Sequence, residues 1–360
     1  MKIGIDVRPL AYGITGNSRY LAEVLELLLP KHPNVEFYFY SNKSIHPVFS
    51  HLVQENVKLR IETRPIPGPI YLNFVLPRKL KNDKIEKFWA TLQMLPFFKL
   101  KIPSYVNYHD LNFISAPDTM ARSNFFQHKL LSPKTIKNAD VIFCLSKNTK
   151  NEISHFFPEA SNKCLVVYPG VKQSKPVKKN FLFPKHFFLT VGTLEPRKNI
   201  KRLVDAYKIF KTENPKDPHD LYILGRKGWG EEGESLYQSL MEEENKNLGI
   251  HFLENPNDDI LGQAFKECKA FFFPSHHEGF GLPLLEAMIE NKRCAASDIP
   301  VFKEILSERC DLFISSQNTE QWTNAFRTMA KVRPNRLPKF DNKFWSWQTT
   351  MKQIEGVIFG

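Results

Sequence analysis

The sequence has little of what marks membrane-spanning or disulfide-bonded proteins. None of its 360 residues lies in an apolar run that approaches the roughly 18 residues of a spanning helix. Asp6 and Arg8 interrupt the first apolar run, so the opening segment does not resemble a secretory signal. The five cysteines include no Cys-x-x-Cys pair and are odd in number. We therefore expect a cytoplasmic protein with reduced thiols and no structural zinc.

Two common nucleotide-binding signatures are missing as well. No strand-like run is followed by a complete Gly-x-Gly-x-x-Gly, which argues against a bound dinucleotide. The turn from Gly225 to Trp229 is rich in glycine and basic residues but lacks the Gly-Lys-Ser/Thr ending of a P-loop. These absences disfavour NAD-dependent and P-loop enzymes.

The composition is that of a folded, basic protein. Hydrophobic residues make up 42% of the chain, enough for two domain cores at this length. The 50 lysines and arginines against 38 acidic residues give a formal charge of +12. Such a charge suits three partner classes, namely nucleic acid, an anionic membrane surface or phosphate-bearing small molecules. Composition alone does not choose between them.

Short apolar runs alternate with amphipathic stretches, which is typical of α/β domains with parallel sheets. The expected strands cover residues 2–6, 35–40, 105–108, 141–145, 164–167, 187–191, 220–224, 250–253, 270–274 and 294–297, with helices at 19–29 and 200–210. A lysine- and proline-rich segment at 172–185 is typical of a linker between two domains. We expect domains at 1–172 and 173–340, followed by a C-terminal segment at 341–360.

The turn from Glu278 to Glu286 is the strongest motif. It follows an apolar run and precedes a predicted helix, with Pro283 suited to the first helical turn. Gly279 and Gly281 would let a ligand approach the backbone, and a helix N-terminus favours a phosphate there. The two glutamates would then need donors of their own, such as sugar hydroxyls. The alternative is an ordinary strand–helix turn with one solvated and one capping glutamate.

A second turn between a strand and a helix runs from Gly192 to Asn199. Asn199 suits the N-cap of the following helix. Arg197 and Lys198 stand at the carboxyl end of a strand, where α/β sheets bind ligands, and paired cations suit a diphosphate. Gly225 opens a similar turn, and we count Gly192 and Gly225 among the candidate nucleotide-binding residues. The alternative is that these basic side chains are simply solvated.

Two candidate residues in the first half of the chain also lie near the carboxyl end of a predicted strand. Gly16 belongs to a glycine-containing loop that follows the first strand and opens the first helix. His109 ends the strand-like run SYVNYH, which is a ligand-facing position. A structural histidine is the alternative.

Taken together, these segments resemble the retaining glycosyltransferases of family 4, which have the GT-B fold. The similarity covers essentially the whole chain and is carried, in order, by KIGIDVRPL, TGNSRYLAEVL, YHDLNF, CLSKNTKNEI, VVYPGV, FLTVGTLEPRKNI, LYILGRKGW, FFFPSHHEGFGLPLLEAM and ASDIPVFKEIL. The fold class that the resemblance implies is α/β, with two Rossmann-like, doubly wound domains facing a central cleft. The C-terminal SWQTTMKQIEGV would form a helix that crosses back to the N-terminal domain.

The resemblance also implies roles for the two glutamates and the two cations. Glu278 would hold hydroxyls of the donor sugar, and Glu286 the ribose of the nucleotide. Arg197 and Lys198 would clamp the diphosphate and stabilise the departing nucleotide. The family needs no divalent metal, which agrees with the lack of an Asp-x-Asp motif, so we expect no cofactor.

Further contacts follow from the same resemblance. Backbone N–H groups of Phe280, Gly281 and Leu282 would contact the sugar and phosphates. His109 would lie over the reacting sugar, and Gly16 would bring backbone near the phosphate. His276 and His277 depart from the family pattern, and we assign them no role.

The implied activity is transfer of a hexose, with GDP-mannose as the first choice of donor because TGNSRY resembles mannosyltransferases. The acceptor would be a glycan or a lipid-linked glycan in cell-surface polysaccharide assembly. The alternatives are an inactive nucleotide-sugar-binding subunit and a nucleic-acid-binding protein. No nucleic-acid-binding motif is present, so we expect no nucleic-acid partner.

The segment 78–101 suggests a further, peripheral contact with the inner face of the membrane. It combines seven lysines and arginines with Phe88, Trp89, Phe97 and Phe98. Basic and aromatic residues together suit an anionic headgroup layer. An ordinary solvated face over a buried core is the alternative.

Overall fold

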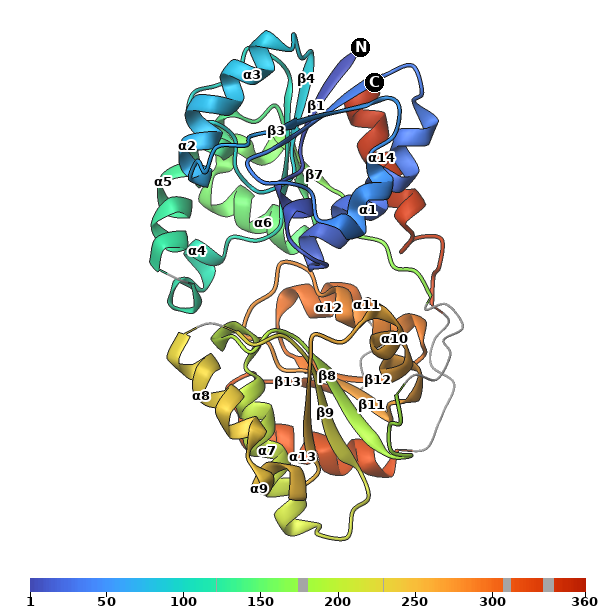
Figure 1. Cartoon of the computed structure of the whole chain (residues 1–360). Coiled ribbons are helices and arrows are strands. Elements are labelled where there is room, and N and C mark those ends of the chain that lie inside the picture. The colour runs from blue at the N-terminus through green and yellow to red at the C-terminus, as the bar shows by residue number, and fades with distance from the viewer. Residues whose placement is uncertain (121, 174–180, 229, 307–311, 333–339) are drawn as a thin grey trace. The chain divides into compact units, whose positions relative to one another are not determined.

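A computed structural model describes residues 1–120, 122–173, 181–228, 230–306, 312–332 and 340–360. The chain divides into two compact units (Figure 1). The first comprises Met1–Phe113, Arg122–Gly170 and Lys343–Gly360, and the second comprises Ile114–Ala121 and Val171–Asn342. Of the expected linker, residues 174–180 lie outside the described part of the chain, as do Cys310 and residue 229.

The first unit is built on a seven-stranded sheet with the order β3-β2-β1-β4-β5-β6-β7, and each neighbouring pair is parallel. Its strands are β1 (Lys2–Asp6), β2 (Glu36–Ser41), β3 (Val57–Ile61), β4 (Lys87–Ala90), β5 (Ser104–Tyr108), β6 (Val141–Cys144) and β7 (Cys164–Val166). The apolar side chains of the central strands are buried, as expected for parallel strands that helices cover on both faces, whereas Leu59 of β3 and Leu165 of β7 at the two edges are exposed.

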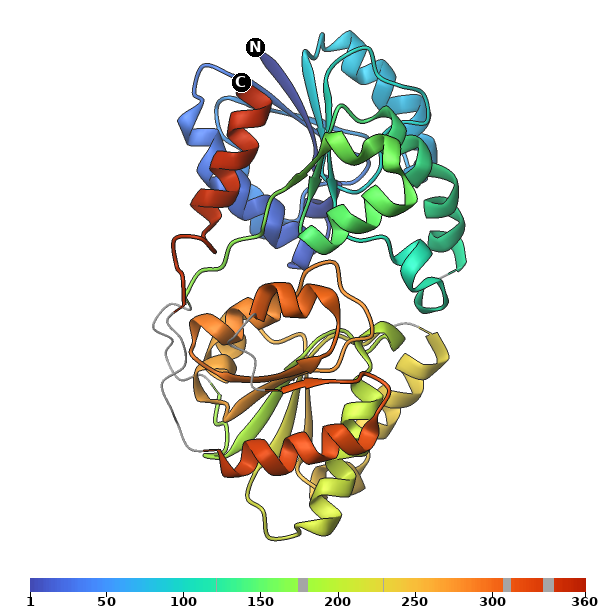
Figure 2. The same ribbon diagram turned by 180° about the vertical axis from the view of Figure 1, so that it is seen from behind.

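Helices lie on both faces of this sheet (Figures 1 and 2). They are α1 (Gly16–Leu28), α2 (Gly68–Ile70), α3 (Leu76–Asn82), α4 (Asn112–Ser115), α5 (Arg122–Asn138), α6 (Lys147–Phe156) and α14 (Trp347–Phe359), with a π-helical turn at Tyr71–Val75. The order of the strands reverses direction between β1 and β4, so α1 lies on one face while α3, α5 and α6 lie on the other.

The last helix, α14, returns to the first unit and packs beside α1 (Figure 1). Its Glu355 Oε1 lies 2.8 Å from His32 Nε2, and the Ile358 carbonyl accepts from Lys87 Nζ at 2.6 Å. The rings of His32 and Phe359 stack with centroids 3.8 Å apart. The expectation that a C-terminal helix crosses back is therefore confirmed.

The second unit contains a six-stranded sheet with the order β10-β9-β8-β11-β12-β13, again with parallel neighbours. Its strands are β8 (Phe187–Val191), β9 (Asp220–Gly225), β10 (Ile250–Glu254), β11 (Ala270–Phe273), β12 (Arg293–Ser297) and β13 (Leu312–Ile314). Its helices are α7 (Ile200–Glu213), α8 (Gly230–Met241), α9 (Glu243–Asn247), α10 (Asp258–Glu267), α11 (Leu282–Ile289), α12 (Pro300–Leu306) and α13 (Thr319–Lys331).

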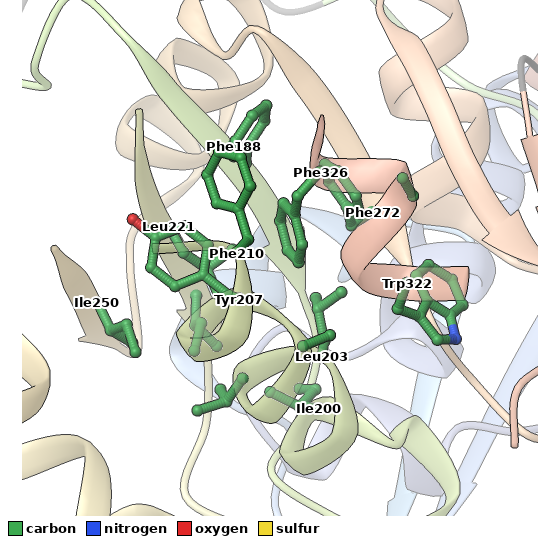
Figure 3. Close-up of a cluster of buried hydrophobic side chains, with 14 of the residues drawn as sticks. Phe188, Ile200, Leu203, Tyr207, Phe210, Leu221, Ile250, Phe272, Trp322 and Phe326 are labelled. Atoms are coloured by element: carbon green, nitrogen blue, oxygen red, sulfur yellow. The ribbon is translucent and has the colours of Figure 1, made fainter. Parts of the chain in front are cut away.

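An apolar core fixes α7 against this sheet (Figure 3). Phe326 of α13 stacks on Phe272 of β11 at 4.3 Å between centroids and meets Phe188 of β8 at 5.3 Å. Ile200, the first residue of α7, is almost fully buried in the same cluster. The packing therefore fixes the start of α7, which lies two residues after Lys198.

Both sheets have a topological switch point, where the strand order reverses and ligands bind in open α/β folds. It lies between β1 and β4 in the first unit and between β8 and β11 in the second. The expected doubly wound α/β architecture is confirmed in both units. The expected cleft between them stays a prediction.

Candidate functional site

The turn between β8 and α7 projects the first part of the site. It contains a short 3₁₀ helix at Pro196–Lys198, and Asn199 adopts a left-handed conformation with φ 54°. The expected side-chain N-cap is wrong, because Asn199 makes no capping hydrogen bond within the described residues. Its Nδ2 instead donates to the carbonyls of Pro274 at 3.0 Å and Ser316 at 2.8 Å. Asn199 thus ties the β8–α7 turn to the segment that follows β11.

Three of the predicted residues meet where these two segments adjoin. Arg197 Nη1 lies 2.6 Å from Glu278 Oε2, and Lys198 Nζ lies 2.5 Å from Glu278 Oε1. Arg197 Nη1 also donates to the His277 carbonyl at 3.1 Å. Ser275 Oγ donates to Glu278 Oε1 at 2.8 Å. The Glu278 carboxylate is therefore held by both cations and a hydroxyl.

Glu195 belongs to the same cluster, although the sequence did not single it out. Its Oε1 lies 2.7 Å from Arg197 Nη2, so the guanidinium bridges two carboxylates. A glutamate two residues before an arginine is common on protein surfaces, and that spacing alone does not indicate a site. Only the burial of the group, with Arg197 about one-fifth exposed, distinguishes it.

The cluster shifts the pKa of two of its groups. Burial by itself would raise the pKa of Glu278, but Arg197 and Lys198 outweigh it and lower that pKa to about 2. Burial lowers the pKa of Lys198, with Glu278 opposing the change and Arg197 reinforcing it. Glu278 is therefore ionised at neutral pH. Such a buried group of opposite charges, with the cations at a strand end, can exchange carboxylate oxygens for those of an anionic ligand.

Two predicted glycines allow the backbone of these turns to pack closely. A Cβ on Gly225 would lie 1.8 Å from the Gly192 carbonyl oxygen, so no larger residue fits there without a shift. A Cβ on Gly192 would meet the Lys198 stem at 3.5 Å, an ordinary contact. The structure thus places Gly192 and Gly225 beside the cationic turn and gives Gly225 a packing role.

The strongest predicted motif runs from Glu278 into α11. Gly281 occupies the N-cap with φ 128°, a conformation that side-chain-bearing residues rarely adopt. Phe280 is buried, whereas Leu282 and Glu286 on α11 are half-buried. Leu282 and Glu286 are four residues apart and so share a face of the helix. The N-terminus of α11 adds partial positive charge beside the cluster.

Gly16 and His109 lie in the first unit. Gly16 opens α1 behind a capping box of Thr15 and Ser18, and a Cβ on it would have nothing within 4 Å. His109 follows β5 and is buried, and its Nε2 lies 3.1 Å from the Thr91 carbonyl. A carbonyl only accepts, so Nε2 carries the proton. Burial lowers the pKa of His109, although the nearby Asp110 opposes this shift. The ring is therefore neutral at pH 7.

The parts of the chain that the structure describes contain no group of three or more His, Cys, Asp or Glu residues arranged to hold a metal. The expectation that the reaction needs no cofactor stays a prediction. No helix within those same parts is long and apolar enough to span a bilayer.

Comparison with known proteins shows a similarity to one family. Residues 172–340, which carry the whole cationic cluster, match the family model of the glycosyl transferases group 1. This match covers 169 of the 360 residues, so the similarity to this family is carried by the second half of the chain. Over 307 residues the chain is 27% identical to the O-antigen chain mannosyltransferase RfbU of Salmonella typhimurium, covering 84% of the chain and 82% of RfbU.

Two further comparisons concern a second relative and a solved structure. The chain is 33% identical over 162 residues to the serotype-specific mannosyltransferase WbdA of Escherichia coli, which is 45% of this chain but 19% of WbdA. The structure of Anabaena Alr3699/HepE in complex with UDP and glucose matches with a TM-score of 0.69 at 16% identity, covering 100% of this chain and 99% of that chain. The chain therefore has the GT-B fold predicted from its sequence.

Proposed function

We propose that the protein transfers a hexose, with retention of anomeric configuration, from a nucleotide-diphosphate sugar to a glycan or lipid-linked acceptor during cell-surface polysaccharide assembly. GDP-mannose is the first choice of donor. The observation that carries the proposal is the meeting of Arg197, Lys198 and Glu278 at the switch point between β8 and β11.

The chemistry of transfer explains why such a cluster is useful. The bond from the anomeric carbon to the diphosphate oxygen breaks, and its electron pair leaves with the nucleoside diphosphate. A bond forms from the acceptor oxygen to the same carbon, and the acceptor proton passes to the leaving oxygen. Arg197 and Lys198 are fixed in advance where that negative charge would develop, which is the most effective form of electrostatic stabilisation.

Glu278 has a second task in this proposal. The diphosphate takes over Arg197 and Lys198, and the released carboxylate oxygens accept hydrogen bonds from hydroxyls of the sugar. Glu286 holds the ribose from its position on α11. The same exchange explains how two glutamates can stand beside an anion site without repelling the ligand.

The choice of donor is supported by the activities of similar proteins. RfbU and WbdA are mannosyltransferases, which favours mannose. The HepE complex contains UDP and glucose, so UDP-hexoses are the next choice, followed by dTDP-rhamnose.

A panel of nucleotide sugars tests the proposal in two steps. Differential scanning fluorimetry first ranks GDP-mannose, UDP-hexoses and dTDP-rhamnose, because a ligand at 100 times its dissociation constant adds about 2.7 kcal/mol of stability. The best donor is then incubated with lipid-linked glycans, and NMR reads the anomeric configuration of the product. Binding without transfer would support an inactive subunit, and an inverted product would contradict retention. No stabilisation by any nucleotide sugar would overturn the proposal.

A further inference from the structure

Exposed apolar side chains gather on one face of the first unit. In its described part, the four most exposed large apolar side chains are Phe98 at 78%, Leu130 at 65%, Phe126 at 64% and Phe74 at 59%. Their positions correct the sequence interpretation of this region. Phe88 and Trp89 are fully buried in β4, and α5 contributes two of the exposed side chains instead.

Three segments hold these side chains on the same face. The Phe97 N–H donates to Asn73 Oδ1 at 2.7 Å, which joins the loop after β4 to the helical turn at Tyr71–Val75. The Phe97 carbonyl accepts from Asn138 Nδ2 at 3.0 Å, and Lys134 Nζ lies 5.2 Å from the Phe97 ring, which joins the loop to α5. Figures 1 and 2 show α2, α3 and α5 on the sheet face opposite α1.

The same segments carry charge of one sign. Residues 68–82, 94–103 and 122–138 contain nine lysines and arginines and no aspartate or glutamate. Two of these cations have carboxylate partners from neighbouring segments, since Lys79 pairs with Glu62 and Lys99 with Asp140. The exposed cations of these segments are Arg78, Lys81, Lys99, Lys101, Arg122, Lys129, Lys134 and Lys137. We call this surface, with Phe74, Phe98, Phe126 and Leu130, the aromatic-basic face.

We propose that the aromatic-basic face docks onto an anionic bilayer surface, with its apolar side chains among the acyl-chain ends and its lysines at the headgroups. Exposed apolar side chains that gather on one face, in contrast to scattered ones, mark a site of interaction with a protein or a membrane. Anionic headgroups attract lysines near the surface, and the apolar side chains between them add buried area. Leu130 has no aromatic face on which a nucleotide base could stack, which favours a lipid over a single-stranded nucleic acid.

Sedimentation with sucrose-loaded vesicles tests the proposal independently of donor chemistry. The full chain should bind vesicles of equal parts phosphatidylcholine and phosphatidylglycerol at least tenfold better than vesicles of phosphatidylcholine alone. Binding should weaken as salt is raised, because added ions screen the attraction. Equal recovery on the two kinds of vesicle would overturn the proposal.

Two variants separate the apolar and the charged contributions. Phe98→Ser combined with Phe126→Ser should lower the partition coefficient at least tenfold and leave the salt dependence in place. Lys101→Glu combined with Lys129→Glu should lower it comparably and flatten the salt dependence. The matched controls, Val48→Ser in the 3₁₀ helix Pro47–Leu52 beside α1 and Lys246→Glu in the second unit, should change it less than twofold. Circular dichroism checks that each variant is folded.

Other occupants of the face are readily told apart. If the chain self-associates in sedimentation velocity and the phenylalanine variant abolishes this without affecting vesicles, the face is an interface between copies and the proposal is wrong. Tight binding of a random oligonucleotide that the lysine variant abolishes, with no vesicle binding, would also overturn it. A loss of vesicle binding in folded variants of the face alone would support it.

Discussion

Arg197 Nη1 and Glu278 Oε2 lie 2.6 Å apart, although the two residues are 81 positions apart in the chain. Their contact joins the segments that follow the two strands on either side of the switch point in the second unit. The guanidinium is also bonded to Glu195, so any anion that binds Arg197 must compete with two carboxylates. This competition makes the roles of the charged groups separable by mutation.

Removing either cation should impair transfer more than folding. We expect Arg197→Ala or Lys198→Ala to lower kcat by roughly two orders of magnitude or more, on the scale of losing one preorganised donor. Arg197→Lys should be intermediate, because lysine lacks the guanidinium fork. Steady-state kinetics per folded molecule measures the effect. Arg202→Ala, one turn into α7, is the control, and an equal loss there would contradict the assignment.

Glu278→Gln should separate the sugar from the nucleotide. Because Glu278 pairs with both cations, we expect tighter binding of free nucleoside diphosphate together with a severe loss of transfer. Calorimetric titration beside a transfer assay measures both. Glu195→Gln should also bind the diphosphate more tightly but retain more transfer activity. Weaker diphosphate binding by Glu278→Gln would argue against the exchange of carboxylate for phosphate oxygens at the two cations.

The same glutamate predicts a pH dependence of stability. The pKa of Glu278 is about 2 in the folded protein, below the ordinary value for a glutamate. The ionised Glu278 therefore stabilises the folded state by about 3 kcal/mol. This contribution is complete above about pH 5 and is lost as the pH falls towards 2. Urea unfolding should show the gap between wild type and Glu278→Gln narrowing over this range. A gap that stays constant down to pH 2 would mean that the ion pairs do not stabilise the fold.

Two glycine substitutions distinguish a ligand-binding role from a packing role. Gly16→Ala has open space for its Cβ at the start of α1, so stability should be unchanged or rise by up to about 1 kcal/mol. Donor affinity should nevertheless fall, if backbone at Gly16 contacts the phosphate as the sequence predicts. Gly225→Ala should lower stability by about 1–3 kcal/mol, because its Cβ would strike the Gly192 carbonyl. Melting temperatures and donor titrations of both variants measure these effects.

His109 should be a neutral Nε2–H tautomer at pH 7. Its folded pKa is lowered by burial, so unfolding becomes easier as the pH falls below about 6.5 and the unfolded histidine takes up a proton. ¹H–¹⁵N spectra of histidine-labelled protein, with His109→Gln for assignment, report both tautomer and titration. A midpoint at or above 6.5 would contradict the effect of burial on the pKa, and an Nδ1–H signal would contradict the hydrogen bond to Thr91.

The regular part of the fold was predictable because its apolar runs are long and follow the periods of strands and helices. The predicted strand at 187–191 coincides with β8, and the other predicted strands fall within one residue of the observed ends. β3, β4 and β13 were missed, and of these β4 lies at the centre of its sheet. It has only four residues and follows a lysine-rich stretch, so its Phe88 and Trp89 resembled surface aromatics.

Within the site, local chemistry identified the charged residues but not their partners. A basic pair at a strand end and a glutamate before a helix each suggest a ligand, which is why Arg197, Lys198 and Glu278 could be singled out. Asn199 was misassigned because a left-handed residue before a helix is not apparent from sequence, and its side chain bonds 75 and 117 positions away. Long-range hydrogen bonds of this kind depend on the finished packing.

The return of α14 to the first unit affects the order in which the chain can mature during synthesis. The ribosome has made the first unit up to residue 170, including α1, long before it makes the segment from residue 343 onward that contains α14. α14 packs against α1, so that surface of α1 stays uncovered until then. At roughly 5–20 residues per second, that interval is about 9 to 35 seconds. During it, apolar side chains such as Tyr20, which later meets Trp347, await their partner while the second unit is being made and can fold. The first unit is thus completed last, and a chaperone has the longest time to bind it.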